Sequence, residues 1–213
     1  MSVYKRNEQT KKFIIGEYST SEIKYLKDND WIWTEKVDGT NIRVMWDGKD
    51  VVYAGRSDEA QLYTPLLWKL DTYFKSPEQR EKLMQIFGTG DSVGEGWLED
   101  TVVLYGEGYG AKIQKGGGNY IKDGVDFVLF DVRIGHWQLE RENVEDIANK
   151  LGLKVVPIIG YGTLDEAMEM TKKGFKSQWG DFMAEGIVMR PRVELFTRKG
   201  DRIITKVKHK DFI

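Results

Sequence analysis

The sequence predicts an α+β fold with mainly antiparallel sheets flanked by helices, and three observations support this prediction. Short segments rich in β-branched and aromatic residues follow one another closely, with tight-turn sequences between them. Elsewhere, apolar residues recur at helical spacing in separate blocks. The regular alternation of strand and helix that builds a parallel sheet is missing. Because no internal repeat or Pro/Ser-rich linker divides the 213 residues, we expect one domain.

The predicted strands occur in clusters. Residues 31–37, 41–47 and 51–55 are expected to be consecutive antiparallel strands, because glycine-containing turn sequences separate them. Two buried strands are expected around a glycine-rich stretch at 106–118, and two more near the C-terminus. These further strands span 102–105, 127–132, 187–189 and 203–207.

Helices are predicted between the strand clusters. Apolar residues recur at helical spacing in 66–74, 83–87 and 144–151. Ser76 suits an N-cap with Pro77 at the first helical position, so the second helix begins there. Thr163 and Glu166 form a capping box for a fourth helix, which ends at Gly174.

Composition excludes several kinds of function. The chain has no cysteine, which excludes a disulfide framework, a thiolate zinc site, an iron–sulfur cluster and a cysteine nucleophile. Its two histidines, His136 and His209, leave little room for a histidine-rich metal site. Apolar residues make up 40% of the chain, without a signal-peptide core or a membrane-spanning run, so we expect a soluble cytoplasmic protein.

Charge is distributed unevenly along the chain. The formal net charge is −2, so the whole molecule does not indicate a nucleic-acid partner. Residues 190–213 nevertheless hold eight Lys or Arg and three acidic residues, a net charge of +5. Such a segment is either a solvated tail or a contact for nucleic acid.

One lysine stands in a position suited to nucleophilic chemistry. Lys36 ends an apolar strand within residues 35–41 (Glu-Lys-Val-Asp-Gly-Thr-Asn), before a glycine turn that allows close backbone approach to a ligand. Taken alone, it is either a nucleophile or an ordinary hairpin-edge residue. The glycine-rich residues 105–110 match neither the Walker pattern nor the dinucleotide fingerprint.

Four further motifs follow Lys36 in order. They are 104–108 (Leu-Tyr-Gly-Glu-Gly), 127–131 (Phe-Val-Leu-Phe-Asp), 185–190 (Glu-Gly-Ile-Val-Met-Arg) and 205–208 (Thr-Lys-Val-Lys). Together they make the chain resemble the superfamily of polynucleotide ligases and mRNA-capping enzymes. That resemblance implies a nucleotidyltransferase (adenylyltransferase) domain of ATP-grasp-like fold over residues 1–213, in which a lysine carries a nucleoside monophosphate.

The position five residues after Lys36 distinguishes subclasses of this superfamily. DNA ligases and capping enzymes usually have arginine there, whereas this chain has Asn41. Asparagine resembles ATP-dependent RNA ligases of the T4 double-stranded-RNA, nick-sealing type. Residues 105–107 and 113–116 are similar to that type as well. Only five residues follow Lys208, so we expect neither an OB-fold domain nor a C-terminal ligase accessory domain.

The resemblance implies a three-step reaction. Lys36 would attack the α-phosphate of ATP, expel pyrophosphate and hold AMP as a phosphoramidate. AMP would pass to an RNA 5′-phosphate, and a 3′-hydroxyl would then displace it. The implied cofactors are ATP and Mg²⁺ or Mn²⁺. The implied partner is RNA with 5′-phosphate and 3′-hydroxyl ends in a nicked duplex, joined in RNA repair by a monomeric protein without membrane contact.

The resemblance also assigns roles beside the phosphate. Lys206 and Lys208 would contact the α-phosphate, and Glu185 would hold the metal. Two lysines at i and i+2 on a strand point to one face, as a shared phosphate needs, although any amphipathic strand has this pattern. An acid directly before Gly186 also suits a plain turn.

The remaining motif residues would bind the nucleoside. Glu107 would accept a hydrogen bond from a ribose hydroxyl, and Phe130 would stack on adenine. The plain alternatives are a solvated glutamate and ordinary core packing. Further implied contacts come from Asn41, Arg56, Glu35 and Val37, the last two through backbone groups. Asn41 also suits a turn and Arg56 an exposed surface.

Rival functions remain open at this point. A compact DNA ligase or a capping-type guanylyltransferase would share the covalent chemistry, and nucleotide choice would separate them. A non-catalytic RNA-binding module would use the seven Trp and ten Tyr as stacking surfaces. Such a module has no need for Lys36, Glu185 and Lys206 together.

Overall fold

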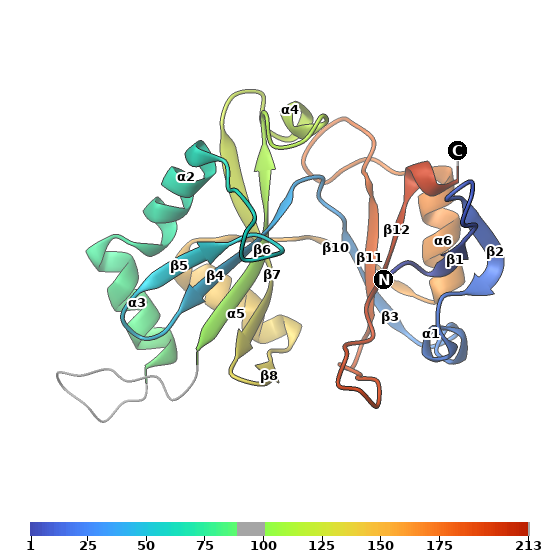
Figure 1. Cartoon of the computed structure of the whole chain (residues 1–213), viewed down its shortest axis with the longest axis horizontal. Coiled ribbons are helices and arrows are strands. Elements are labelled where there is room, and N and C mark those ends of the chain that lie inside the picture. The colour runs from blue at the N-terminus through green and yellow to red at the C-terminus, as the bar shows by residue number, and fades with distance from the viewer. Residues whose placement is uncertain (89–100, 213) are drawn as a thin grey trace. The chain divides into compact units, whose positions relative to one another are not determined.

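The computed structural model describes residues 1–88 and 101–212. The chain divides into two compact units, which we call unit 1 (Met1–Val37 with Val156–Ile213) and unit 2 (Asp38–Val155). Unit 2 is therefore inserted into the sequence of unit 1, and no linker-like composition marks either junction. Figure 1 labels most of the helices and strands of both units.

Unit 1 consists of a hairpin, a four-stranded sheet and the helices packed on them. In chain order, its elements are β1 (Tyr4–Arg6), β2 (Phe13–Tyr18), α1 (Ser21–Tyr25), β3 (Trp31–Glu35), β10 (Ile158–Gly162), α6 (Leu164–Lys173), β11 (Gly186–Pro191), β12 (Thr205–Lys208) and the 3₁₀ turn η1 (His209–Asp211). β1 pairs with β2, and the sheet has the antiparallel order β10-β3-β11-β12. β12 is thus an edge strand beside β11.

The core of unit 1 lies between one face of this sheet and α6. Trp31 and Trp33 of β3 and Val207 of β12 are buried there with Leu164 and Met168 of α6. Because side chains alternate along a strand, every second residue of β12 falls on the opposite face. That opposite face carries the lysines discussed below.

Unit 2 is a helix-covered sheet. Its elements are β4 (Thr40–Trp46), β5 (Val51–Ala54), α2 (Thr64–Phe74), α3 (Pro77–Phe87), β6 (Val102–Gly110), α4 (Gly117–Tyr120), β7 (Val125–Ile134), β8 (Trp137–Gln138), α5 (Arg141–Leu151) and β9 (Lys154–Val155). The strand order is β5-β4-β6-β7-β8, and β9 runs parallel to β7 beside it. α2, α3 and α5, which are labelled in Figure 1, bury their apolar faces in one hydrophobic cluster with this sheet.

The predicted α+β class with antiparallel sheets is confirmed, and so are the predicted helix ends. The hydroxyl of Ser76 accepts a hydrogen bond from the Gln79 backbone at 3.2 Å at the start of α3. Thr163 and Glu166 form the expected capping box of α6. The helix stops at Gly174, whose φ of +79° suits glycine.

The glycine-rich stretch corrects the expected end of one strand. The strand predicted at 102–105 continues through the glycines to Gly110 as β6. A Cβ atom on Gly106 would lie 2.3 Å from the Phe127 ring, and one on Gly108 would lie 2.3 Å from the Leu66 side chain. These glycines make room for neighbouring side chains in the packed sheet, so they do not mark a loop.

Several elements were not predicted, and their sequences explain why. The sequence of β2, Phe-Ile-Ile-Gly-Glu-Tyr, does not alternate apolar and polar residues, so it lacks the periodic signal that indicates a half-buried strand. β10 contains Gly160 and Gly162, which weaken strand propensity. β1, α1, α4, β8 and β9 have five residues or fewer, too short for a periodic signal. Across residues 1–88 and 101–212, no helix has the length and apolar character needed to cross a membrane.

Candidate active site

Lys36 lies immediately after β3, at the end of the unit 1 sheet. Its backbone N–H donates to the Gly186 carbonyl oxygen at 2.9 Å, so the chain continues the pairing with β11 at this point. Its Nζ lies 2.5 Å from Oε2 of Glu185, and its side chain is only 15% exposed. A weaker contact joins Nζ to the Val37 carbonyl oxygen at 3.4 Å. The lysine is therefore fixed by a carboxylate, unlike a free hairpin-edge residue.

Glu185 joins Lys36 to a second lysine. Its Oε1 lies 2.6 Å from Nζ of Lys208, and the Glu185 side chain is 12% exposed. We call Lys36, Glu185 and Lys208 the lysine–carboxylate cluster. Strand order creates it, because Glu185 directly precedes β11, which lies between β3 and β12. The register pairs Gly186 with Lys208, which brings the start of β11 to the end of β12.

Lys206 and Lys208 share the face of the sheet opposite its core. Thr205 and Val207, which alternate with them on β12, are buried. Lys206 is exposed and Lys208 is half-buried. Gly186 allows β11 to come this close, because a Cβ atom there would lie 2.1 Å from the Val207 carbonyl oxygen. The glycine of this motif therefore serves strand packing beside the cluster.

Glu35 is a buried carboxylate directly before Lys36. It accepts a hydrogen bond from the Ser177 hydroxyl at 2.5 Å and one from the Gln178 backbone N–H at 2.7 Å. Burial raises the pKa of Glu35 above its ordinary value, although both hydrogen bonds act to lower it. Its backbone N–H donates to the Pro157 carbonyl oxygen at 3.1 Å, so that N–H already has a partner in the fold.

Ser177 and Gln178 are site neighbours that sequence reasoning missed. They lie in the segment between α6 and β11, and they reach Glu35 across 142 and 143 residues of sequence. No motif marks them. They are identified in the structure as the hydrogen-bond donors to the buried carboxylate of Glu35, which directly precedes Lys36.

In unit 2, Asn41 and Glu107 lie directly opposite each other. β4 pairs with β6 so that Asn41 is the register partner of Glu107, and both side chains are half-buried. On β4, Ile42 and Val44 belong to the core, so Asn41 lies on the face of the sheet away from it. Two motif residues 66 positions apart thus form one cross-strand pair.

Phe130 lies at a β-bulge in β7. The register shifts there, since Leu129 is the partner of Gly106 and Asp131 is the partner of Tyr105. Leu129 and its neighbours Phe127 and Val132 are core residues, whereas Phe130 is half-buried and lies outside both hydrophobic clusters. Its position is therefore not that of an ordinary core phenylalanine.

Arg56 is exposed in the segment after β5. The better-anchored arginine nearby is Arg43, whose guanidinium donates to the Gly55 carbonyl oxygen at 2.8 Å and to Asp58 at 2.6 Å. Arg56 thus directly follows the residue whose carbonyl oxygen anchors Arg43, and Arg56 itself is exposed.

Gly39 has a packing role that its sequence context does not reveal. The sequence predicts that its lack of a side chain permits close approach to a ligand, and this stays a prediction. A Cβ atom there would lie 2.2 Å from the Gly108 carbonyl oxygen and 2.7 Å from the Glu107 side chain. Gly39 is required by the packing of its own turn against β6.

The residues present fit a metal ion held mainly by phosphate. In the part of the chain that the structure describes, no group of three or more His, Cys, Asp or Glu side chains could enclose a metal. Mg²⁺ commonly binds through one or two carboxylates, several waters and substrate phosphates. Glu185 supplies one such carboxylate, flanked by two ammonium groups that favour an anion nearby.

The lysine–carboxylate cluster can perform two chemical tasks. Lys208 is a fixed cation that can stabilise negative charge on a phosphoryl group. Lys36 can attack phosphorus only as a neutral amine, so its ion pair with Glu185 must open first. Both tasks belong to phosphoryl transfer.

Comparison with known proteins agrees with this chemistry. A family model described as RNA ligase matches residues 29–208. No curated protein sequence gives a significant match. The motifs and the lysine–carboxylate cluster, Lys36, Glu185 and Lys208, lie within the matched residues.

Solved structures of Naegleria gruberi RNA ligase share the fold. A lysine-to-alanine variant with ATP and Mn has a TM-score of 0.64 and 19% identity, covering 90% of this chain and 53% of that one. A glutamate-to-alanine variant with AMP and Mn has a TM-score of 0.65 and 18% identity, with coverages of 90% and 53%. The structure with pyrophosphate has a TM-score of 0.63 and 20% identity, and the match covers 90% of this chain and 52% of that one. This chain spans about half the length of these proteins.

Proposed function

Because the chain belongs to the RNA ligase family, we propose that it is an ATP-dependent RNA ligase that works through a covalent lysine–AMP intermediate on Lys36. One observation carries the proposal. Lys36 is held 2.5 Å from Glu185, which also binds Lys208 at 2.6 Å. A fixed amine, a carboxylate and a second cation are the groups that adenylate transfer to lysine requires.

In the first step, the Lys36 amine, having released one proton to solvent, attacks the α-phosphorus of ATP, and it releases a second proton to solvent as the phosphorus–nitrogen bond forms. The bond between the α-phosphorus and the bridging oxygen breaks, and pyrophosphate leaves with that electron pair. Lys208 and Lys206 stabilise the charge on the α-phosphate oxygens. Mg²⁺ or Mn²⁺, when bound, neutralises further phosphate charge, and Glu185 is the carboxylate that would hold it.

The unit 2 candidates bind the nucleoside in this proposal. Glu107 and Asn41 form a pair of half-buried polar side chains on neighbouring strands, suited to ribose hydroxyls. Phe130, at its bulge outside the core, stacks on adenine. Arg56 contacts sugar or phosphate. Glu35 and Val37 contribute backbone carbonyl groups, since the Glu35 N–H is occupied by Pro157.

The later steps use RNA ends. AMP passes from Lys36 to a 5′-phosphate, and a 3′-hydroxyl then attacks that phosphate and releases AMP. We propose a nicked duplex as substrate, RNA repair as the process and a monomeric cytoplasmic protein as the agent. The basic residues of 190–213 supply positive charge for the RNA backbone.

The first experiment tests covalent nucleotide transfer. The purified chain is incubated with α-labelled ATP or GTP and Mg²⁺ and then separated under denaturing conditions. We expect label on the protein with ATP only, and none on Lys36→Ala. Preferential labelling by GTP would favour a capping-type guanylyltransferase, and absence of any label on the folded protein would favour a binding module.

A second experiment tests the RNA substrate. Nicked duplexes are prepared with RNA or DNA on the 3′-hydroxyl side, and sealing is followed by strand length. We expect the RNA 3′-end to be sealed and the DNA 3′-end to be sealed more slowly. Equal or faster sealing of the DNA end would favour a compact DNA ligase.

A further inference from the structure

Lys206 and Lys208 lie on an edge strand, and their backbone N–H groups are held from outside the sheet. β12 ends the strand order, so N–H groups that point away from β11 find no partner in the sheet. The Lys206 N–H donates to the Met1 carbonyl oxygen at 2.9 Å. The Lys208 N–H donates to Oδ2 of Asp211 at 2.9 Å. Residues at both ends of the chain therefore fix the backbone of this strand.

Asp211 is itself held by the β1–β2 hairpin. Its Oδ1 accepts a hydrogen bond from the Arg6 guanidinium at 2.8 Å, and its side chain is only 7% exposed. Arg6 also donates to the Lys11 carbonyl oxygen at 2.9 Å, and it lies 4.4 Å from the centre of the Phe13 ring. Arg6 is thus held within the hairpin by Lys11 and by Phe13 of β2.

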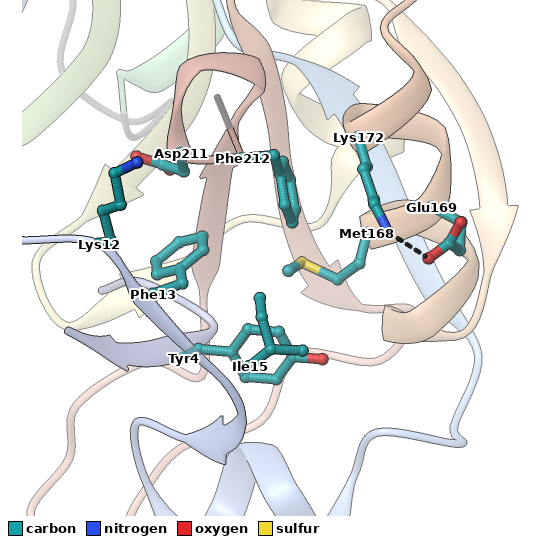
Figure 2. A pocket seen from close by; sticks show the side chains of 9 residues that line it. All are labelled: Tyr4, Lys12, Phe13, Ile15, Met168, Glu169, Lys172, Asp211 and Phe212. Atoms are coloured by element: carbon teal, nitrogen blue, oxygen red, sulfur yellow. Dashed lines mark ion pairs between the residues drawn. The ribbon is translucent and has the colours of Figure 1, made fainter. Parts of the chain in front are cut away.

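Aromatic packing supports the same contact. Phe13 of β2 and Phe212 meet edge to face, with ring centres 6.0 Å apart. Figure 2 shows both rings lining a pocket together with Tyr4 and Met168, with Asp211 at its edge beside Phe212. The 3₁₀ turn that carries Asp211 is therefore anchored by packing as well as by its ion pair.

We propose that Arg6 and Asp211 are positioning residues for Lys208. Asp211 fixes the Lys208 backbone, and Arg6 fixes Asp211, so the Lys208 ammonium is presented to Glu185 and to phosphate in one place. In this proposal both residues act through Lys208, and neither is assigned a contact with the nucleotide. Both lie outside residues 29–208, which the family model matches. The inference rests on the proposed function, because it assigns its effect to adenylate transfer.

The main test compares single variants in the ATP-labelling reaction under single-turnover conditions. For Asp211→Ala, we expect the rate constant to fall between about tenfold and about a hundredfold, since a misplacement of about 1 Å has that scale of effect. Asp211→Asn keeps an oxygen acceptor and should recover most of the rate. Arg6→Ala should give a smaller loss, because Asp211 retains its contact with Lys208.

Lys5→Ala is the matched control. Lys5 is the neighbour of Arg6 on β1, and its contact with Glu17 is 3.6 Å long with both side chains more than half exposed. Like Arg6→Ala, the Lys5→Ala substitution removes one positive charge from β1, but it leaves the contact between Arg6 and Asp211 in place. We expect wild-type labelling from it.

Two further measurements separate positioning from general stability. In a Lys208→Ala background, Asp211→Ala should cause no additional loss of labelling rate. If Asp211 only stabilised the fold, Asp211→Ala would lower the rate by the same factor in the Lys208→Ala background as in wild type. Hydrogen exchange of the Lys208 amide, followed without ATP, should be at least about tenfold faster in Asp211→Ala because its acceptor is gone.

The outcomes distinguish the two proposals. If the wild type is labelled and Asp211→Ala matches Lys5→Ala, the positioning role is wrong while the ligase chemistry stands. An additive loss in the Lys208→Ala background, or an unchanged Lys208 amide, also overturns the positioning role. If the folded wild type takes no label, the proposed function fails, and the catalytic effect assigned to Asp211 fails with it.

Discussion

Nζ of Lys36 and Oε2 of Glu185 lie 2.5 Å apart, although 149 residues separate them in sequence. The pairing of β3 and β11 makes this meeting possible, since Ile187 is the register partner of Glu35. The same carboxylate reaches Lys208 with its other oxygen. One acidic side chain therefore organises two motif lysines from different strands.

Removing Glu185 should cost more stability than removing either lysine. Glu185→Ala leaves the ammonium groups of Lys36 and Lys208 close together without their shared carboxylate. Lys36→Ala leaves Glu185 paired with Lys208, so its loss should be smaller. Urea unfolding at pH 7 should place the midpoint of Glu185→Ala below that of Lys36→Ala. The reverse order would contradict the shared ion-pair arrangement.

Glu185 also gives a prediction for activity. Glu185→Gln keeps the size and one acceptor oxygen but removes the negative charge. We expect its rate of adenylate transfer to fall by about 10²-fold or more, as when a fixed electrostatic group is lost. Raising the Mg²⁺ concentration should recover part of this rate, because metal affinity is reduced. Wild-type rates for Glu185→Gln at every Mg²⁺ concentration would remove Glu185 from the chemistry.

Glu35 should make stability depend on pH in an uncommon direction. Its pKa in the folded protein is raised, with burial as the largest cause, so folding favours the protonated form. Its contribution is therefore greatest below the unfolded pKa and is lost as the pH rises through the folded pKa.

Glu35→Gln provides the measurement for this dependence. The free energy of unfolding of the variant, relative to wild type, should increase as the pH is raised from about 4 through the raised pKa of Glu35, and it should level off above that pKa. Glu17→Gln, at a position whose side chain is 54% exposed, is the control and should show no such trend. A relative stability of Glu35→Gln that falls with pH would contradict the assigned direction.

Asp126 should behave in the opposite way. Burial acts to raise its pKa, but hydrogen bonds from Tyr73 and the Phe127 backbone, together with Lys154, lower it overall. Its contribution is therefore present above the unfolded pKa and lost as the pH falls through the lower folded pKa. Asp126→Asn should lose about 1–3 kcal/mol at pH 7. That difference should shrink below about pH 4 in urea titrations, and a difference independent of pH would contradict the account.

The strand glycines should not tolerate a methyl group. Gly106→Ala would place Cβ 2.3 Å from the Phe127 ring and 2.4 Å from the Val128 carbonyl oxygen. We expect a loss of about 1–3 kcal/mol or failure to fold, as in other overpacked cores. Gly118→Ala in α4 is the control, because nothing lies within 4 Å of its added Cβ. Equal melting temperatures for the two variants would show that β6 is not packed as described.

The motifs and the antiparallel strands could be predicted because their signals are local. Lys36, Lys206 and Lys208 stand in short sequences with a characteristic spacing, and alternation on β12 places both of its lysines on one face. Capping residues such as Ser76 act within one helical turn, so their effect is also local.

The supporting contacts could not be predicted, because they depend on strand order and register. Glu35 meets Ser177 across 142 residues, and Arg6 meets Asp211 across 205 residues. The local sequence around Gly39 and Gly106 does not show that each packs closely against another part of the same unit. A single sequence contains no local signal for such neighbours.

The most direct test of the central claim is to locate the nucleotide on the protein. The wild type is incubated with ATP and Mg²⁺, digested, and analysed by mass spectrometry for peptides that carry AMP. We expect AMP on Lys36 and on no other lysine, and no adduct in Lys36→Ala that is folded at the assay temperature. AMP on a different lysine, or an adduct that persists in Lys36→Ala, would contradict the central claim.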